Sequence, residues 1–409
     1  MNRLAKMLAG TFLAGAGTAH AADLEVTHWW TSGGEAAAVS EFAKAFNENT
    51  DHNWIDGAIA GSGGTARPII ISRIIGGDPM GATQLNHGRQ AEELIEAGLL
   101  TDLTELAEQQ GWKDIVNPPS LLEACTFEGR IYCVPVNIHS WQWMWLSHGA
   151  YDAAGIPVPS DWNAFIESAP KLQEAGIVPL AIGQQSWQQR GAFDVLSVAI
   201  AGVDAWRKVV VNRDVGAAMG PEYQNVFAAI ETARQLAADS NVQDWNQATN
   251  MVITGKAGAQ IMGDWAQGEF QIAEQVAGED YTCLPGLGMN EVLDTGGDAF
   301  YFPVIDDPEV QKAQLELAST LISPDVQVAF NLKKGSLPVR GDIDLSAAND
   351  CMQKGLDILK AGGILPSGDM NLTPDTQTQI EDLMAEFWST DMSAADAQAH
   401  YADLIRAAE

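Results

Sequence analysis

The first third of this chain alternates between short apolar strands and amphipathic helices joined by brief polar links. Residues 24–30, LEVTHWW, alternate as a strand does, and residues 35–49 repeat apolar side chains at the spacing of one helix face. The same pair recurs in NWIDGAIAG with TARPIIISRIIGG, and in ATQLNH with GRQAEELIEAGLL. This order predicts an open α/β sheet of parallel strands with helices on both faces. Ligands bind such sheets beyond the carboxyl ends of the strands, where Trp29, Trp30 and Asn86 fall.

The length and charge of the chain narrow its class. A chain of 409 residues favours two domains over one hydrophobic core. A formal net charge of -32 disfavours binding to nucleic acid or to an anionic membrane, because both require Lys and Arg. From about residue 137 the pattern becomes rich in helices, and strand character returns around 294–305. We therefore expect a second domain of a different composition after the first.

The first 21 residues have the composition of a secretory signal peptide. Arg3 and Lys6 form a short positive region, residues 7–19 are small and apolar, and the following AHA matches a cleavage site. We expect cleavage after Ala21 or Ala22 and export of the mature chain. The alternative is a buried N-terminal helix. No later apolar run approaches the roughly 20 residues that cross a bilayer.

Four cysteines allow three disulfide pairings, and export makes disulfides possible. Cys125 and Cys133 flank TFEGRIY, which predicts a short hairpin with its turn near Glu128-Gly129. We therefore pair these two, and pair Cys283 with Cys351. No C-x-x-C occurs, so we expect no zinc site of that kind.

The stretch HWWTSGGE, residues 28–35, places two tryptophans and a carboxylate where a strand gives way to a helix. Ser32 and Glu35 fit a capping box, in which the glutamate bonds back to the cap amide. Adjacent strand residues point to opposite faces, so Trp29 and Trp30 cannot both enter one core. The residues alone leave two interpretations open: a helix cap beside a core, or a ligand site.

Enzyme motifs are lacking from the chain. It has no G-x-S-x-G, H-E-x-x-H or G-x-x-x-x-G-K-[ST]. The stretch GSGGTA, residues 61–66, imitates a dinucleotide fingerprint. We interpret it instead as a turn that lets a polar ligand approach, with Pro68 at the first helical position.

The second half of the chain adds side chains that suit a sugar. Residues 262–269, MGDWAQGE, place Asp264 and Trp265 just after an apolar run, and residues 331–340, NLKKGSLPVR, place two lysines before a glycine turn. A tryptophan face matches the C–H face of a pyranose ring, and carboxylates, amides and a lysine bond its hydroxyls. These residues favour the ligand site over the helix cap.

Six stretches of the sequence resemble a known family. The stretches ADLEVTHWWTSGGE, VPVNIHSWQWMWLS, GIPVPSDWNAF, GIVPLAIG, GDWAQGE and NLKKGSLPVR are similar to family-1 extracellular solute-binding proteins of ABC importers, and most similar to glucose-binding members. The resemblance implies two α/β lobes joined by crossing strands, with a sugar in the cleft, no catalysis and no cofactor. It also implies a periplasmic monomer that binds a monosaccharide and delivers it to the permease subunits.

The resemblance also implies lobe limits and site residues. The N-terminal lobe would comprise residues 22–136 and about 295–340, and the C-terminal lobe residues 137–294 and about 341–409. The residues that match the sugar-contacting positions of the family are Trp29, Trp30, Glu35, Trp265, Asp298 and Lys334.

Two positions depart from the glucose-binding pattern. Asn86 stands where relatives often carry lysine or histidine, and Asp369 stands near the position of a histidine. These changes make the pocket more negative and put glucose in doubt. We consider an amino sugar such as glucosamine, against a neutral hexose whose hydroxyls Asp369 accepts.

Two other functions remain as alternatives. A secreted glycoside hydrolase would also use tryptophans and acids, but it requires two carboxyl groups about 5–10 Å apart across one bond. A binder of polyols, oligosaccharides or amino acids is the other. An amino-acid binder would require an arginine clamp, and the sequence shows no arginine near the tryptophan sites.

Overall fold

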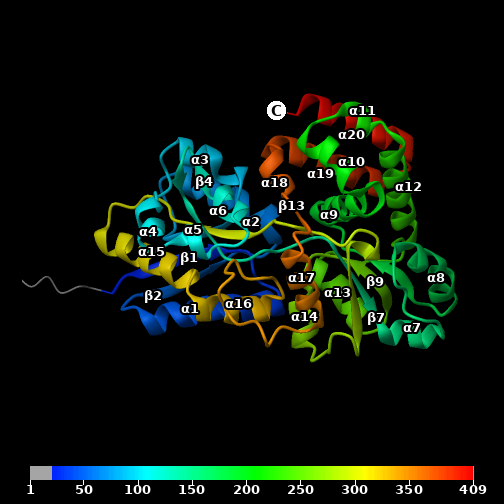
Figure 1. The fold of residues 1–409 in the computed structure, drawn as a ribbon, viewed down its shortest axis with the longest axis horizontal. Helices are drawn as coiled ribbons and strands as arrows, with labels where there is room; N and C mark the ends of the chain where they lie inside the picture. The colour runs from blue at the N-terminus through cyan, green and yellow to red at the C-terminus, as the bar shows by residue number, and fades with distance from the viewer. Residues whose placement is uncertain (1–20, 409) are drawn as a thin grey trace, which may run out of the picture.

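A computed structural model describes residues 21–408, apart from the side chain of Asp369. The signal peptide predicted for residues 1–21 therefore lies almost wholly outside the described part. Within that part, no helix is long and apolar enough to cross a membrane. Two sheets with their helices form two lobes side by side (Figure 1), as the α/β prediction requires.

The first sheet has five strands in the order β2-β1-β3-β12-β6. β1 pairs in parallel with β2 and β3, which confirms the parallel arrangement predicted from the strand–helix alternation. β12 pairs antiparallel with both β3 and β6, so a strand from late in the chain sits inside this sheet. The bounds of these strands are Asp23–His28 for β1, Asn53–Ala58 for β2, Ala82–Asn86 for β3, Cys133–Pro135 for β6 and Asp298–Tyr301 for β12.

Helices from two separate stretches of the chain, before residue 125 and between residues 308 and 334, cover the first sheet. In the view of Figure 1, α1 and α16 lie below β1, and α2 lies above it. Pro68 lies inside α2 rather than at its first position, because that helix already begins at Ser62, after a left-handed Gly61. The bounds are Gly33–Asn49 for α1, Ser62–Ile75 for α2, Glu92–Glu96 for α3, Thr104–Gln109 for α4, Trp112–Ile115 for α5, Ser120–Ala124 for α6, Pro308–Leu321 for α15 and Pro324–Lys334 for α16.

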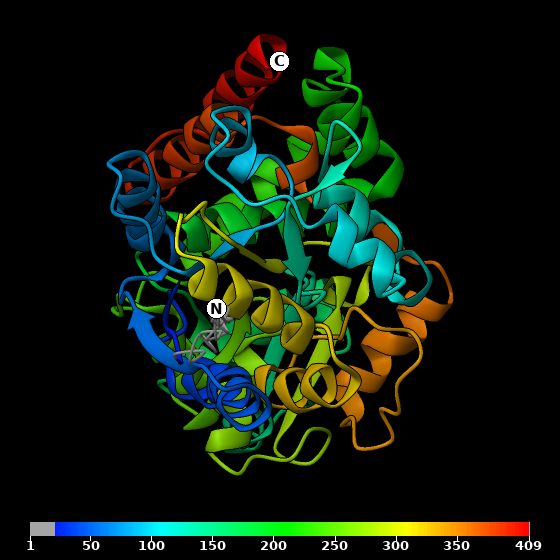
Figure 2. The same ribbon diagram turned by 90° about the vertical axis from the view of Figure 1, so that its left-hand side faces the viewer.

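The second sheet has four strands in the order β10-β7-β9-β8. The C-terminal helices α19 and α20 pack against α9 and α12 on this lobe, and Figure 2 shows the red end of the chain beside green helices. The strands are β7 (Trp143–Ser147), β8 (Val178–Ala181), β9 (Ala257–Ile261) and β10 (Tyr281–Pro285). The helices are α7 (His148–Ala154), α8 (Trp162–Glu174), α9 (Ser186–Leu196), α10 (Gly202–Trp206), α11 (Val215–Ala218), α12 (Pro221–Leu236), α13 (Trp245–Ile253), α14 (Ala266–Ile272), α17 (Asp350–Lys360), α18 (Gly368–Asn371), α19 (Pro374–Ser389) and α20 (Ala394–Ala407).

Three segments cross between the sheets: residues 136–142, 286–297 and 335–349. They bond to one another, since the His139 amide donates to the Gly296 carbonyl at 3.1 Å and the Ile138 amide to the Leu337 carbonyl at 2.7 Å. The crossing segments therefore form a joint between the two halves. The predicted residue limits of the lobes stay a proposal.

Both predicted disulfides are confirmed. Cys125 is bonded to Cys133, and Cys283 to Cys351. The first pair closes the hairpin of β4 (Thr126–Phe127) and β5 (Arg130–Ile131). Its two turn residues, Glu128 and Gly129, have φ of 47° and 81°. Positive φ at both positions is the geometry of a tight two-residue hairpin turn, so the turn lies where the sequence predicts it.

Candidate ligand-binding cleft

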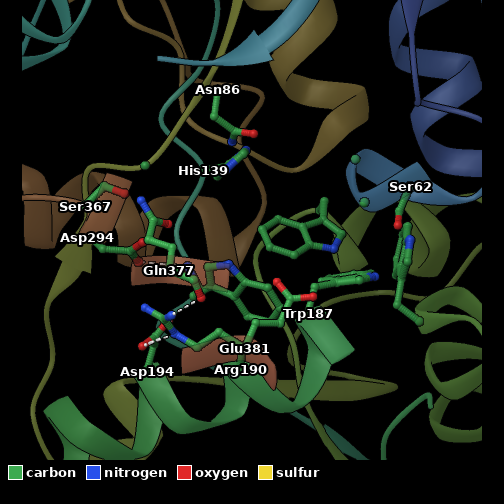
Figure 3. Close-up of a pocket in the computed structure, with 18 of the residues that line it drawn as sticks. Ser62, Asn86, His139, Trp187, Arg190, Asp194, Asp294, Ser367, Gln377 and Glu381 are labelled. Carbon is green, nitrogen blue, oxygen red and sulfur yellow. Dashed lines mark hydrogen bonds and ion pairs between the residues drawn. The ribbon is translucent and has the colours of Figure 1, made fainter. Parts of the chain in front are cut away.

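A cavity of about 390 Å³ lies between the two lobes. Such a volume falls within the range of small-molecule sites in proteins. Side chains from both sheets and from the crossing segments line it, and Figure 3 shows Asn86 and His139 at one side, Trp187 and Glu381 in the middle, and Ser62 at the far edge. The predicted site residues that line it are Trp29, Trp30, Glu35, Asn86, Trp265, Asp298 and Lys334.

Trp29 and Trp30 follow β1 and turn to different surroundings. Trp30 is 1% exposed, and its ring packs 5.3 Å from Phe330 and 5.8 Å from Phe300, between centroids. Trp29 stays partly exposed, with the Arg67 guanidinium 5.8 Å from its ring. The Trp30 ring thus belongs to the core and reaches the cleft wall, and the Trp29 ring faces the cleft. Adjacent residues of a strand point to opposite faces in this way.

Glu35 lies in the first turn of α1, and its amide and its carboxylate have different partners. Its amide donates to the Ser32 hydroxyl at the start of α1, as a helix cap. Its carboxylate Oε1 accepts a hydrogen bond of 2.7 Å from Lys334 Nζ, at the end of α16. Burial raises the pKa of Glu35, and the charge of Lys334 opposes that rise. Ser32 is therefore the cap of α1, and its hydroxyl also lies 3.3 Å from Glu35 Oε2. The predicted bond from the Glu35 carboxylate back to the Ser32 amide is not among the hydrogen bonds of the described residues, and the carboxylate instead pairs with Lys334.

Lys334 lies between two aromatic rings. Its Nζ is 5.6 Å from the Trp30 ring and 5.9 Å from the Trp265 ring, and its side chain is 2% exposed. Among the described residues, the carboxylate of Glu35 is the hydrogen-bond acceptor of this ammonium. An ammonium carries three donors, so two remain for a ligand in the cleft.

Trp265 belongs to a group of rings on the second lobe. It precedes α14, and its ring covers Gly263, where a Cβ would come within 2.0 Å of it. Trp141 meets it edge-on at 4.8 Å, and Trp187 lies 5.6 Å from Trp141. Trp265 is only 7% exposed, so these neighbours hold it firmly. Aromatic rings fixed in this way offer rigid apolar faces to a flat ligand.

Asp298 begins β12 opposite Asn86 of β3. Its carboxylate accepts from Gln84 Nε2 at 2.7 Å, Asn137 Nδ2 at 2.9 Å and His139 Nδ1 at 3.0 Å. Burial alone would raise the pKa of Asp298, but the charge and hydrogen bond of His139 hold it well below its usual range. Asp298 in turn raises the pKa of His139 against the effect of burial. The two form an ion pair at the cleft wall.

Two further carboxyl groups converge on Ser140 in the first crossing segment. Asp264 Oδ2 accepts from the Ser140 amide at 2.9 Å, and Asp294 Oδ1 accepts from the Ser140 hydroxyl at 2.7 Å. Burial raises the pKa of Asp264 to about 8 and also raises the pKa of Asp294. Asp294 lines the cleft. Neither carboxyl was among the predicted site residues.

Several other cleft residues were also missed. His139, Trp141 and Trp187 stand in HSWQWMW and SWQQR, where nothing in the local pattern separates a cleft ring from a core ring. The expectation that no arginine lies near the tryptophans was wrong. Arg67 faces Trp29, and Arg190 lines the cleft with its guanidinium bonded to Asp194 (Figure 3). Folding brings these residues together from separate elements.

The remaining predicted residue is Asp369. It lies in α18, and its side chain is outside the described part of the structure. Its neighbours Ser367 and Gly368 line the cleft. A role for the Asp369 carboxylate stays a prediction.

Comparisons with known proteins agree with this architecture. The sequence profile of the bacterial extracellular solute-binding proteins matches residues 30–303. A "Probable sugar-binding periplasmic protein" of Rhizobium meliloti is 36% identical over 85% of this chain and 84% of its own. The xylose/arabinose-binding protein XacG of Haloferax volcanii is 25% identical, over 80% of this chain and 72% of its own.

Solved structures share the fold. The bacterial solute receptor AcbH, described as having an exclusive preference for β-D-galactopyranose, aligns with a TM-score of 0.77 at 19% identity and covers 94% of this chain and 99% of its own. A chitin oligosaccharide binding protein aligns with a TM-score of 0.76 at 18% identity, over 94% of this chain and 98% of its own. With two lobes, a cleft between them and a family profile that matches most of its length, the chain belongs to the bacterial extracellular solute-binding proteins.

Proposed function

We propose that this protein binds a monosaccharide of the glucose type in the cleft and delivers it to the permease subunits of an ABC importer. The observation that carries the proposal is the buried Lys334–Glu35 pair in a cleft that is also lined by Trp29, Trp187 and Trp265. These three rings offer apolar faces, and the lysine offers charged donors in the same cleft. A pyranose has the same division between its C–H faces and its hydroxyl edge.

The relatives support a sugar over other solutes. Four of them, 34% to 36% identical to this chain, are named probable sugar-binding periplasmic proteins. Others bind, by their names, pentoses or glucose. An amino-acid ligand would require an arginine near the tryptophans, and Arg67 and Arg190 both line the cleft. However, Arg190 is bonded to Asp194, and Arg67 donates to the Gly63 carbonyl, so both already have acceptors.

The same relatives support a location in the periplasm and a role without catalysis. The signal-like first 21 residues agree with export. We infer that the acids of the cleft bind hydroxyls instead of cleaving a glycosidic bond, because the family profile and the relatives are those of solute-binding proteins.

A thermal-shift screen of the mature chain tests the proposal. The panel comprises hexoses, pentoses, disaccharides, amino sugars, polyols and amino acids. A ligand at about 100-fold its dissociation constant should add about 2.7 kcal/mol to the free energy of unfolding. We expect monosaccharides to give the largest shifts. A shift with amino acids alone, or with none of the panel, would overturn the proposal.

The hydrolase alternative has its own test. Purified protein is incubated with aryl glycosides of glucose, galactose and xylose, and the release of the aryl group is followed by absorbance. We expect release no faster than in buffer. Turnover that is lost in Asp298→Asn would favour a hydrolase instead.

A further inference from the structure

Four carboxyl groups at the cleft interact electrostatically in two pairs, Glu35 with Asp298 and Asp264 with Asp294, and all but Asp264 line the cavity. Glu35 is paired with Lys334, and Asp298 with His139. Burial lowers the pKa of the neighbouring His87 to about 4, so this histidine supplies no charge at neutral pH. Asp264, with a pKa of about 8, keeps its proton at pH 7. Asp294 is then the member of this group whose hydrogen bonds among the described residues all come from neutral donors.

These two carboxyl groups meet at one residue. Ser140 donates its amide to Asp264 and its hydroxyl to Asp294, so both acids are held by neutral donors. The Trp141 amide adds a second neutral bond to Asp294 Oδ1, at 2.8 Å. Like charges that lie close together in a weakly polar site repel each other. Burial raises the pKa of both acids, and the charge of Asp294 raises the pKa of Asp264 further.

Each acid also has an oxygen without a protein donor. Asp264 is 5% exposed, and its Oδ1 has no hydrogen-bond partner among the described residues. Both bonds to Asp294 end on its Oδ1, and within residues 21–408 none reaches its Oδ2. The open oxygen of Asp294 can therefore accept a hydrogen bond from a ligand, and a charged donor bonds a carboxylate more strongly than a neutral one.

The site around Asp264 and Asp294 does not fit a metal ion. Calcium takes six to eight oxygen ligands, and magnesium requires near-octahedral geometry. Among the described residues, no three carboxyl or imidazole ligand atoms of the cleft lie within 4.8 Å of one another. A single protonated amine demands less, since it donates up to three hydrogen bonds in separate directions.

We propose that the bound sugar carries a protonated amine, as in an amino sugar, and that Asp294 accepts a hydrogen bond from it. The inference rests on the proposed sugar-binding function. Asp294 presents its open oxygen at the cleft wall, near Ser367 and Gln377 in Figure 3 and beside the ring cluster of Trp141. The acidic chain, with a formal net charge of -32, also favours the approach of a cation.

Titration calorimetry at pH 7 with glucosamine, glucose and N-acetylglucosamine tests the proposal on the mature chain. Acetylation removes the charge of the amine and keeps the ring. We expect glucosamine to bind at least tenfold more tightly than either neutral sugar. Equal affinity for glucose and glucosamine would overturn the amino-sugar inference and leave the proposed sugar-binding function intact. No binding by any of the three, nor by the wider panel, would overturn both.

Asp294→Asn identifies the residue responsible. It keeps the hydrogen bonds of a neutral acceptor and removes the charge, so the preference for glucosamine over glucose should fall at least fivefold. Asp391→Asn makes the same change of net charge at an exposed position after α19, and should keep the preference. A fall that is equal for both sugars in Asp294→Asn would contradict the inference. If Asp294→Asn does not fold, the three titrations of the parent still decide.

Putrescine is the probe for a site that recognises charge alone. It carries two amines and no ring. We expect it to bind at least a hundredfold more weakly than glucosamine, because it cannot stack on the tryptophans. Binding of putrescine as tight as that of glucosamine would contradict an amino sugar as the ligand.

Discussion

Lys334 Nζ lies 2.7 Å from Glu35 Oε1, although 299 positions separate the two residues in the chain. The contact joins the end of α16 to the first turn of α1, and both side chains are almost fully buried. A buried ion pair is costly to break, because removing one partner leaves the other charge unpaired. The pair thus couples the stability of the first lobe to the chemistry of the cleft.

Lys334→Met should lower the free energy of unfolding by about 3–5 kcal/mol, because Glu35 then stays buried without a cation. The matched control is Lys333→Met. Lys333 pairs with Glu41 at the surface, with 48% of its side chain exposed, so its loss should cost under about 1 kcal/mol. Urea denaturation followed by circular dichroism measures both. Adding Glu35→Gln to Lys334→Met should recover part of the loss, and equal costs in the two single variants would contradict the pairing.

Stability should fall as the pH rises from about 6.5 to 8. The pKa of Asp264 is about 8 in the folded protein and near 3.8 in the unfolded chain, so the folded state holds a proton that the unfolded state has released. Unfolding then becomes easier as pH rises, by about 2 kcal/mol across this window. His139, whose pKa is also raised, acts in the same direction above pH 6.5. His87 acts oppositely, but only between about 4 and 6.5.

Asp264→Asn isolates that effect. The amide stays neutral at every pH, so the melting temperature of the variant should decline less between pH 6.5 and 8 than that of the parent. The residual slope belongs to the other groups whose pKa is raised, which are His139, Glu35 and Asp294. Identical slopes for variant and parent in scanning calorimetry would show that Asp264 does not carry the buried proton.

Trp187→Ala should weaken sugar binding by about tenfold or more and change the melting temperature little. Trp187 is partly exposed at the cleft. Its replacement therefore removes an apolar face for the ligand and little packing from the core. Trp30→Ala is the contrasting variant, because that ring is 1% exposed and its loss should cost about 3–5 kcal/mol of stability. Calorimetry and thermal denaturation of both variants separate the two roles. A Trp187→Ala protein with parental affinity would remove this ring from the site.

Gly34→Ala should destabilise the contact between α1 and α14. A Cβ on Gly34 would come within 2.6 Å of the Gly268 carbonyl carbon, so the two helices would have to move apart. Such overpacking costs about 1–3 kcal/mol. Gly64→Ala, in α2, meets nothing within 4 Å and should be neutral or stabilising by about 0.5–1 kcal/mol. Two variants of equal stability would contradict the close approach of α1 and α14.

The local pattern predicts the elements of this fold well and their long-range partners poorly. The strand ending at His28 and the helix after Ser32 follow from side-chain periodicity and a cap. That β12 lies between β3 and β6 does not follow, because its pairing depends on residues more than 150 positions away. The Glu128-Gly129 hairpin and its disulfide could be predicted because the turn and the cysteines are close in sequence.

In the cleft, too, the local pattern predicts features that are close in sequence and not the contacts between distant residues. The Ser32 cap of α1 is visible in HWWTSGGE, but the bond of Glu35 to Lys334 appears only when α1 and α16 pack together. The two acids around Ser140 come from segments 124 and 154 positions away. No local pattern marks them, since a single aspartate after a strand is common at a turn. Buried acids without cations emerge only from the assembled cleft.

The proposed function requires that the sugar lies between the two lobes and draws them together. Small-angle X-ray scattering of the mature chain, with and without a saturating amount of the most stabilising sugar, measures this closure. Closure of a hinge between two lobes compacts the particle, so we expect a smaller radius of gyration with the sugar than without it. An unchanged radius at full saturation, with binding verified in the same sample by calorimetry, would contradict it.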